Sequence, residues 1–213
     1  MPVTSGDWVA LVVSASFAAG LNVYATVATL GLLARSHALQ LPPALHPLEN
    51  WIVIAVSAAL FAVEFFADKI PVFDLVWNAL HTFVRIPVAA LIAYGATQHL
   101  SPGAQVMSTA LASVIALVAH SSKIAARTMV TPSPEPVSNA ALSMGEDVAA
   151  IGLTWFAVHH PFISAAITVA ALVALIFAVR WMVRGIKRMW RGLRRLGGRD
   201  DSAVDSLAAD RDG

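Results

Sequence analysis

The stretch that decides the fold is EFFADKIPVFDLVWNALHTFVRIP, residues 64–87, an apolar sequence that carries Glu64, Asp68, Lys69, Asp74 and Arg85. The 213-residue chain around it is 58% hydrophobic and only 13% charged, whereas a soluble domain carries about 25% charged residues. A charge at bilayer depth costs about 2.5 kcal/mol or more. We therefore expect a polytopic membrane protein whose costly charges mark its functional site.

Apolar segments follow one another outward from this stretch, and prolines and glycines separate them. They cover residues 8–34, 51–66, 72–97, 104–128, 138–159 and 162–179. The first segment exceeds the length that one crossing needs and is interrupted at Gly20-Leu21-Asn22, so a tilted span and a partly re-entrant helix both fit. The pattern predicts an all-α transmembrane bundle of about five to six membrane segments with broken or re-entrant helices.

Two similar stretches leave an internal repeat open. WNALHTFVRIPVAAL (77–91) and SNAALSMGEDVAAI (138–151) share an Asn-Ala start and a charged-then-small finish. Duplicated halves are common in transporter folds, although short alanine-rich helices also match by chance.

The net charge of +1 conceals a basic end of the chain. Residues 1–179, the expected transmembrane domain, hold five basic and eight acidic side chains, whereas residues 180–213 hold nine and five. Residues 180–198 predict a basic amphipathic juxtamembrane helix that contacts lipid headgroups, and residues 199–213 a disordered tail. The headgroup-contacting residues would be Arg184, Lys187, Arg188, Arg191, Arg194 and Arg195. A plain stop-transfer anchor explains them too, and either reading places the C-terminus in the cytoplasm and involves no nucleic acid.

Polar residues recur at helical spacing on several segments. Asp74, Asn78, His81 and Arg85 are four, three and four residues apart, which places them on one helix face. Facing inward, such stripes would form one substrate or ion pathway. Its expected members are Asn22, Glu64, Asp68, Lys69, Asp74, Asn78, His81, Arg85, His120, Lys123, Arg127, Asn139, Glu146 and Asp147.

A simpler interpretation of these charges stays open. Lys69, Lys123 and Arg127 flank proline or loop signals, so they could lie in the headgroup region, where a charge costs little. Arg85 fits this interpretation less well, because apolar sequence extends on both sides of it.

The sequence nominates no catalytic, metal or cofactor site. It has no cysteine, no His-Glu-x-x-His, no phosphate-binding glycine loop and no Gly-x-Ser-x-Gly elbow. His159 and His160 are adjacent, so their side chains diverge on a helix. An intramembrane lipid-modifying enzyme is therefore the least favoured function.

The residues from Ala15 to Val158 resemble a family of bacterial membrane proteins known as domain of unknown function 4126. The resemblance rests on AAGLNVYATVATLGLLAR (18–35), on the ADKIP-to-Arg85 block and on the SPEPVSN turn (133–139). Val23 stands where relatives often have proline. The resemblance implies a small integral protein of the bacterial inner membrane and no established activity.

Two functions follow from these observations. The first is a small transporter or channel-like protein for an unknown solute or ion, with acids that carry protons or cations and bases that receive an anion. The second is a non-transporting scaffold, with structural ion pairs and a tail that binds lipids or a partner. The sequence leaves an oligomer open.

Overall fold

The computed structural model describes residues 4–68, 70–130 and 136–209, and these ranges contain helices and no strand. The all-α prediction is thus confirmed. The helices are α1 (Ser5–Leu21), α2 (Val23–Arg35), the 3-10 helix η1 (Pro43–Glu49), α3 (Trp51–Ala67), α4 (Pro71–Ala96), α5 (Pro102–Val130), α6 (Pro136–His159) and α7 (Pro161–Ala209).

Within the described residues, four helices are long and apolar enough to cross a membrane, and the candidate segments are Val76–Ala96, Pro102–Arg127, Ala140–His159 and Pro161–Gly185. The pair η1 and α3, bent by 62°, supplies a fifth segment if it is counted as one broken span. This agrees with the expected bundle. Pro71, Pro102, Pro136 and Pro161 each occupy the first position of a helix, where a missing N–H costs nothing and the fixed φ suits the turn.

The chain divides into two units, and the boundary falls inside α7. The first unit runs to Leu172, and the second begins at Val173. The structure describes α7 as helix to Ala209, and the disordered tail over 199–213 stays a prediction. Residues 210–213 lie outside the described residues.

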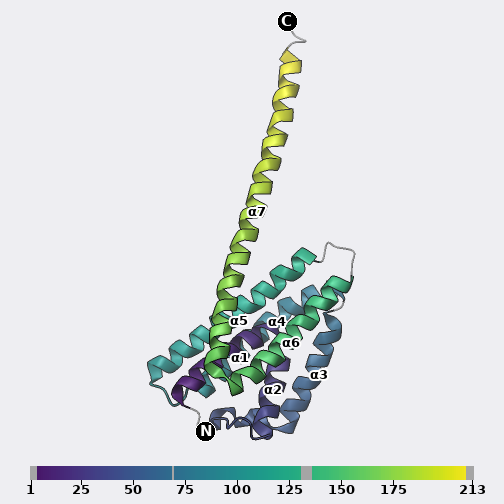
Figure 1. The fold of residues 1–213 in the computed structure, drawn as a ribbon. Coiled ribbons are helices and arrows are strands. Elements are labelled where there is room, and N and C mark those ends of the chain that lie inside the picture. The colour runs from purple at the N-terminus through teal and green to yellow at the C-terminus, as the bar shows by residue number, and fades with distance from the viewer. Residues whose placement is uncertain (1–3, 69, 131–135, 210–213) are drawn as a thin grey trace. The chain divides into compact units, whose positions relative to one another are not determined.

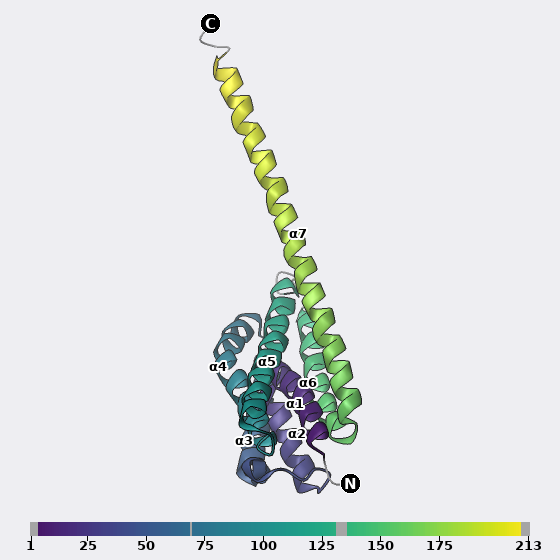
Figure 2. The same cartoon turned by 90° about the vertical axis from the view of Figure 1, so that its left-hand side faces the viewer.

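Within the first unit, α1 and α2 enter and leave the bundle at the same end (Figures 1 and 2). Ser5 and Trp8, at the start of α1, line one pocket together with Gln40 to Pro43, which follow α2. Helices of 17 and 13 residues laid end to end would separate these segments by about 45 Å. The chain therefore turns back at Asn22, which favours the broken, re-entrant form of the first segment over a tilted span.

Other connections gather at the two ends of this unit. Gln98 and His99, between α4 and α5, line the same pocket as Ser5, and Phe162 at the start of α7 lies beside Gly6. We call this the N-terminal end of the bundle. The α3–α4 turn lies at the opposite end, which we call the far end (Figure 1).

The first unit has an apolar outside and a partly polar inside. Phe83 on α4 is 81% exposed, whereas Arg85, two residues later, is 0% exposed. Small residues let the helices approach closely: Gly20 of α1 packs against Ala116 and Ala119 of α5. Small residues at helix contacts are typical of membrane bundles.

Candidate functional site

The site is built around the break at Asn22, which is fully buried. Its backbone is extended (φ −149°, ψ 103°), so it ends α1 and begins α2. The side-chain carbonyl caps α2 by accepting a hydrogen bond from the Ala25 N–H at 3.0 Å. The side-chain amide donates to Asp147 Oδ1 on α6 at 2.8 Å. One asparagine thus joins both half-helices to an acid on another helix.

The last carbonyls of α1 accept hydrogen bonds from two cations. Arg85 Nη1 donates to Gly20 O at 3.1 Å and to Leu21 O at 2.7 Å, and Lys123 Nζ donates to Leu21 O at 3.3 Å. The C-terminus of a helix carries partial negative charge and unpaired carbonyls, so cations are favoured there. This explains why two bases can lie beside an apolar helix.

Arg85 is fully buried and makes its ion pair with Glu64 of α3. The same carboxylate oxygen accepts from Lys123 Nζ at 3.2 Å. Glu64 therefore lies between two cations from α4 and α5, and it links the end of α3 to the helix break.

A second group of ion pairs lies beyond Lys123, on the last turns of α5. Lys123 Nζ is 3.3 Å from Asp68 Oδ2 and 3.4 Å from Glu146 Oε2. Arg127 Nη2 is 2.7 Å from Asp68 Oδ2 and 2.6 Å from Glu146 Oε2. Ser143 adds a hydrogen bond to Asp68 Oδ2 at 3.2 Å. Each of these carboxylates thus has two cationic neighbours.

We call this cluster the charged centre; its described members are Glu64, Asp68, Arg85, Lys123, Arg127, Glu146 and Asp147. Four acids stand against three bases. Asp147 is 4% exposed and has no cationic group within 4.0 Å among the described side chains. Its Oδ1 accepts the Asn22 amide, whereas its buried Oδ2 has no hydrogen-bond partner in the structure. Asp147 therefore differs from the other three acids.

His120 borders the charged centre in its neutral form. Arg85 Nη1, which can only donate, lies 3.2 Å from His120 Nδ1, so Nδ1 must be an acceptor. His120 Nε2 then carries the proton, and it lies 3.1 Å from Asn78 O and 2.8 Å from Thr82 Oγ1. The histidine thus adds no charge that would offset the excess acid.

His81 connects the charged helix face to an apolar pocket. Its Nδ1 donates to the Trp77 carbonyl at 2.6 Å, and its Nε2 shares a hydrogen bond of 2.8 Å with the Tyr24 hydroxyl. Its ring stacks on Trp77 with 4.2 Å between centroids. Tyr24 lines a pocket of about 450 Å³ between α2, η1, α3 and α4.

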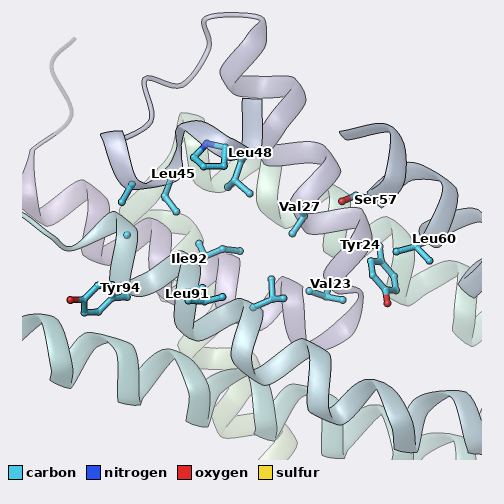
Figure 3. Close-up of a pocket in the computed structure, with 14 residues that line it drawn as sticks. Val23, Tyr24, Val27, Leu45, Leu48, Ser57, Leu60, Leu91, Ile92 and Tyr94 are labelled. Carbon is cyan, nitrogen blue, oxygen red and sulfur yellow. The ribbon is translucent and has the colours of Figure 1, made fainter. Parts of the chain in front are cut away.

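Figure 3 shows this pocket, with Tyr24 and Tyr94 toward its opposite ends and aliphatic side chains between them. Ser57 and the two tyrosines are its polar side chains. Leu91 and Tyr94 are also exposed on the outside of α4, so the pocket borders the apolar surface of the bundle.

The structure brings together most of the residues that the sequence predicts for the pathway. Asn78 joins Arg85 through its side chain at 3.3 Å, and His81 lies at the edge, against Tyr24. Lys69 and the side chains of Asp74 and Asn139 lie outside the described residues. On α7, Arg184, Lys187, Arg188 and Arg191 are exposed, and the side chains of Arg194 and Arg195 are not described.

Sequence reasoning missed Tyr24, Thr82 and the carbonyls of Gly20 and Leu21. Thr82 is four residues from Asn78 and belongs to the same helix face, so spacing alone could have identified it. Tyr24 is separated from His81 by 57 positions, and backbone carbonyls have no sequence signal.

The described residues contain no group of three or more histidines and acids that could hold a metal ion. The paired acids and bases of the charged centre suit ion pairing, proton exchange and the binding of a small charged group.

A family model described as Domain of unknown function (DUF4126) matches residues 9–181. This range includes the whole charged centre. No curated protein and no solved structure matches the chain.

Proposed function

Because the chain belongs to the DUF4126 family, whose description assigns no activity, we propose its function from the site itself: a small transporter or channel-like protein. The unknown solute or ion would bind at the charged centre. The observation that carries this proposal is that Arg85 and Lys123 donate hydrogen bonds to the last carbonyls of a broken helix inside an apolar bundle.

The energetic argument is that stability does not require these charges. Replacing a buried ion pair by apolar residues of similar volume is often neutral or stabilising by about 1–4 kcal/mol. Ionisable residues inside membrane segments mark ion pathways and proton relays more often than scaffolding. Seven such side chains from α3, α4, α5 and α6 meet at one place here.

The broken helix supports the same function. Transporter sites lie where discontinuous helices direct their terminal dipoles and unpaired backbone groups at the substrate. At Asn22, α1 ends in carbonyls and α2 begins in capped N–H groups, and each side has a charged neighbour. In a re-entrant pair the tip at Asn22 can also move without displacing a helix that spans the whole membrane.

The route to the site would open at the far end of the bundle. Glu64, Asp68, Arg85 and Lys123 have no exposed side-chain area, whereas Arg127 and Glu146 are 3% and 9% exposed. The conformation therefore corresponds to a nearly closed state. Separation of the α3–α4 turn from α6 would admit water to Glu146 first.

We place the protein in the bacterial inner membrane as a multi-pass protein with a cytoplasmic C-terminus. The basic residues of α7 support this orientation through the positive-inside rule. With five crossings after a re-entrant α1–α2 pair, the N-terminus lies outside.

The test is ion flux into proteoliposomes that contain the purified protein. Wild type should conduct at least one of the ions H⁺, Na⁺, K⁺, Cl⁻ and phosphate above empty liposomes. Arg85→Ala should abolish that flux, and the lipid-facing control Phe83→Ala should keep it. Flux equal to that of empty liposomes for folded wild type with every ion would remove the support for transport.

A scaffold remains the second candidate, because Arg184, Lys187, Arg188 and Arg191 form an exposed basic stretch. Truncation before Arg184 separates the two functions. A transporter that still inserts keeps its flux, whereas a scaffold loses its association with anionic lipid vesicles or with a partner.

A further inference from the structure

Among the side chains that the structure describes, the charged centre holds one more acid than base. The described members are four acids and three bases. His120 is neutral because Arg85 donates to it. An unbalanced charge in an apolar interior is costly, and a buried carboxyl group can remove it by taking up a proton.

The geometry points to Asp147 as the residue that takes up this proton, and we propose that it is the proton-binding site of the charged centre. This inference rests on the proposed function and names its coupling ion. The other three acids each lie within 4.0 Å of at least two cationic groups, which favours their ionised form. Asp147 has no cationic group within 4.0 Å among the described side chains, and its described polar neighbour is the Asn22 amide. A buried carboxylate oxygen without a hydrogen-bond partner is common to Asp147 and Glu64, so the lack of a cation is what sets Asp147 apart.

Counted over the described side chains, Asp147 and its charged neighbours carry one excess negative charge. Helix α6 packs against α1, α2 and α5. The titratable and charged groups that these elements and α3 bring to the centre are His120, Lys123 and Arg127 from α5, Glu64 and Asp68 from α3, Arg85 from α4, Tyr24 from α2 and the adjacent Glu146. The three cations among them are already paired with Glu64, Asp68 and Glu146.

Protonation of Asp147 would act on the helix break through one bond. The ionised carboxylate accepts the Asn22 amide in a charge-assisted hydrogen bond, which is about twice as strong as a neutral one. Uptake of a proton from hydronium gives a neutral carboxylic acid and water, and weakens this bond. Since the same Asn22 caps α2 through Ala25 N–H, the proton would loosen the link between α6 and the tip of the re-entrant pair.

The experiment is an infrared titration of the full-length protein in lipid vesicles, read at the carboxylic C=O stretching band. A band that disappears as pH rises, and that shifts when the protein contains aspartate labelled with ¹³C at the side-chain carboxyl, is expected for wild type. Asp147→Asn should lose this band, Asp147→Glu should move it out of the ¹³C-aspartate signal, and Glu146→Gln should keep it. The proposal is overturned by wild type alone if no band titrates, or if the titrating band does not shift with labelled aspartate. It is also overturned if the band persists in Asp147→Asn.

Flux measurements separate this proposal from the function on which it rests. A band assigned to Asp147 in a protein without flux leaves the proton site standing and removes the transport function. Flux of an ion by wild type, combined with a titrating band that survives Asp147→Asn, leaves transport standing and overturns the proton site.

Discussion

The pair Arg85 and Glu64 offers the sharpest test of the charged centre. Arg85→Met keeps most of the side-chain volume, but it removes the ion pair with Glu64 and the donors to Gly20 O and Leu21 O. Removing one partner of a buried pair costs about 3–5 kcal/mol, because the other charge stays buried. Lys123 still contacts Glu64 at 3.2 Å, so we expect the lower half of that range, about 3–4 kcal/mol.

The partner substitution Glu64→Gln should cost about as much, since it leaves Arg85 without its carboxylate in the same apolar surroundings. The double variant removes one charge of each sign and keeps Lys123 paired with Asp68 and Glu146. Its cost should therefore fall below the sum of the single costs by about 1–3 kcal/mol, the coupling expected for residues in one network. The carbonyl of Gly20 still loses its donor, so the double variant should not return to wild-type stability.

The assay is reversible unfolding in mixed micelles or bicelles for wild type, both single variants and the double variant. Ser14→Ala combined with Glu64→Gln is the control cycle, because Ser14 bonds Ser164 and Thr168 and shares no partner with Glu64. The control should be additive within about 0.5 kcal/mol. If the stability costs of Arg85→Met and Glu64→Gln add as closely as those of the control cycle, the reasoning is refuted.

Three further outcomes test separate parts of the structure. Gly20→Ala should destabilise the protein by about 1–3 kcal/mol in the same unfolding assay, because the new Cβ would lie 2.6 Å from a backbone oxygen of α5. The control Gly152→Ala should be neutral or stabilising, because its new Cβ would have no other atom within 4 Å. Tyr24→Phe should cost about 0.5–1.5 kcal/mol in thermal unfolding through loss of its hydrogen bond to His81, and an unchanged Tm would contradict that bond. Hydrogen bonds from the side chain and backbone of Thr4 lower the pKa of Asp7. The stabilising contribution of Asp7 is therefore present at neutral pH and is lost as pH falls through that lowered pKa. The stability difference between wild type and Asp7→Asn should shrink in acid, and a difference independent of pH would contradict the cap.

The spacing of residues along the chain was enough to predict the charged faces but not the partners within them. Asn78 and Arg85, predicted to share a face, do hydrogen-bond each other. Glu64 and Asp68 carry like charges four positions apart, a spacing at which such charges repel each other on a helix. In the structure Lys123 offsets much of this repulsion, from a helix 55 to 59 positions away. Such long-range contacts depend on tertiary packing, which a single sequence does not encode locally.

The break at Asn22 shows a second limit of sequence reasoning. Gly20-Leu21-Asn22 predicted an interruption, but a tilted span and a re-entrant pair were equally compatible with its length. What distinguishes them is that the start of α1 and the segment after α2 line one pocket, and the break itself is stabilised by two cations on the carbonyls of α1. Backbone carbonyls are present in every residue, so no composition or spacing signal could single these out.

The central claim is that the charged centre lies at the tip of a re-entrant helix pair, and cysteine labelling tests it most directly. The chain has no native cysteine, so Ser5→Cys, Gln40→Cys and Ile70→Cys each introduce a single exposed thiol. Membrane-impermeant maleimide should label Ser5→Cys and Gln40→Cys from the same side of the membrane, and Ile70→Cys from the other. Labelling of Ser5→Cys and Gln40→Cys from opposite sides would make α1 and α2 a complete crossing and contradict the account.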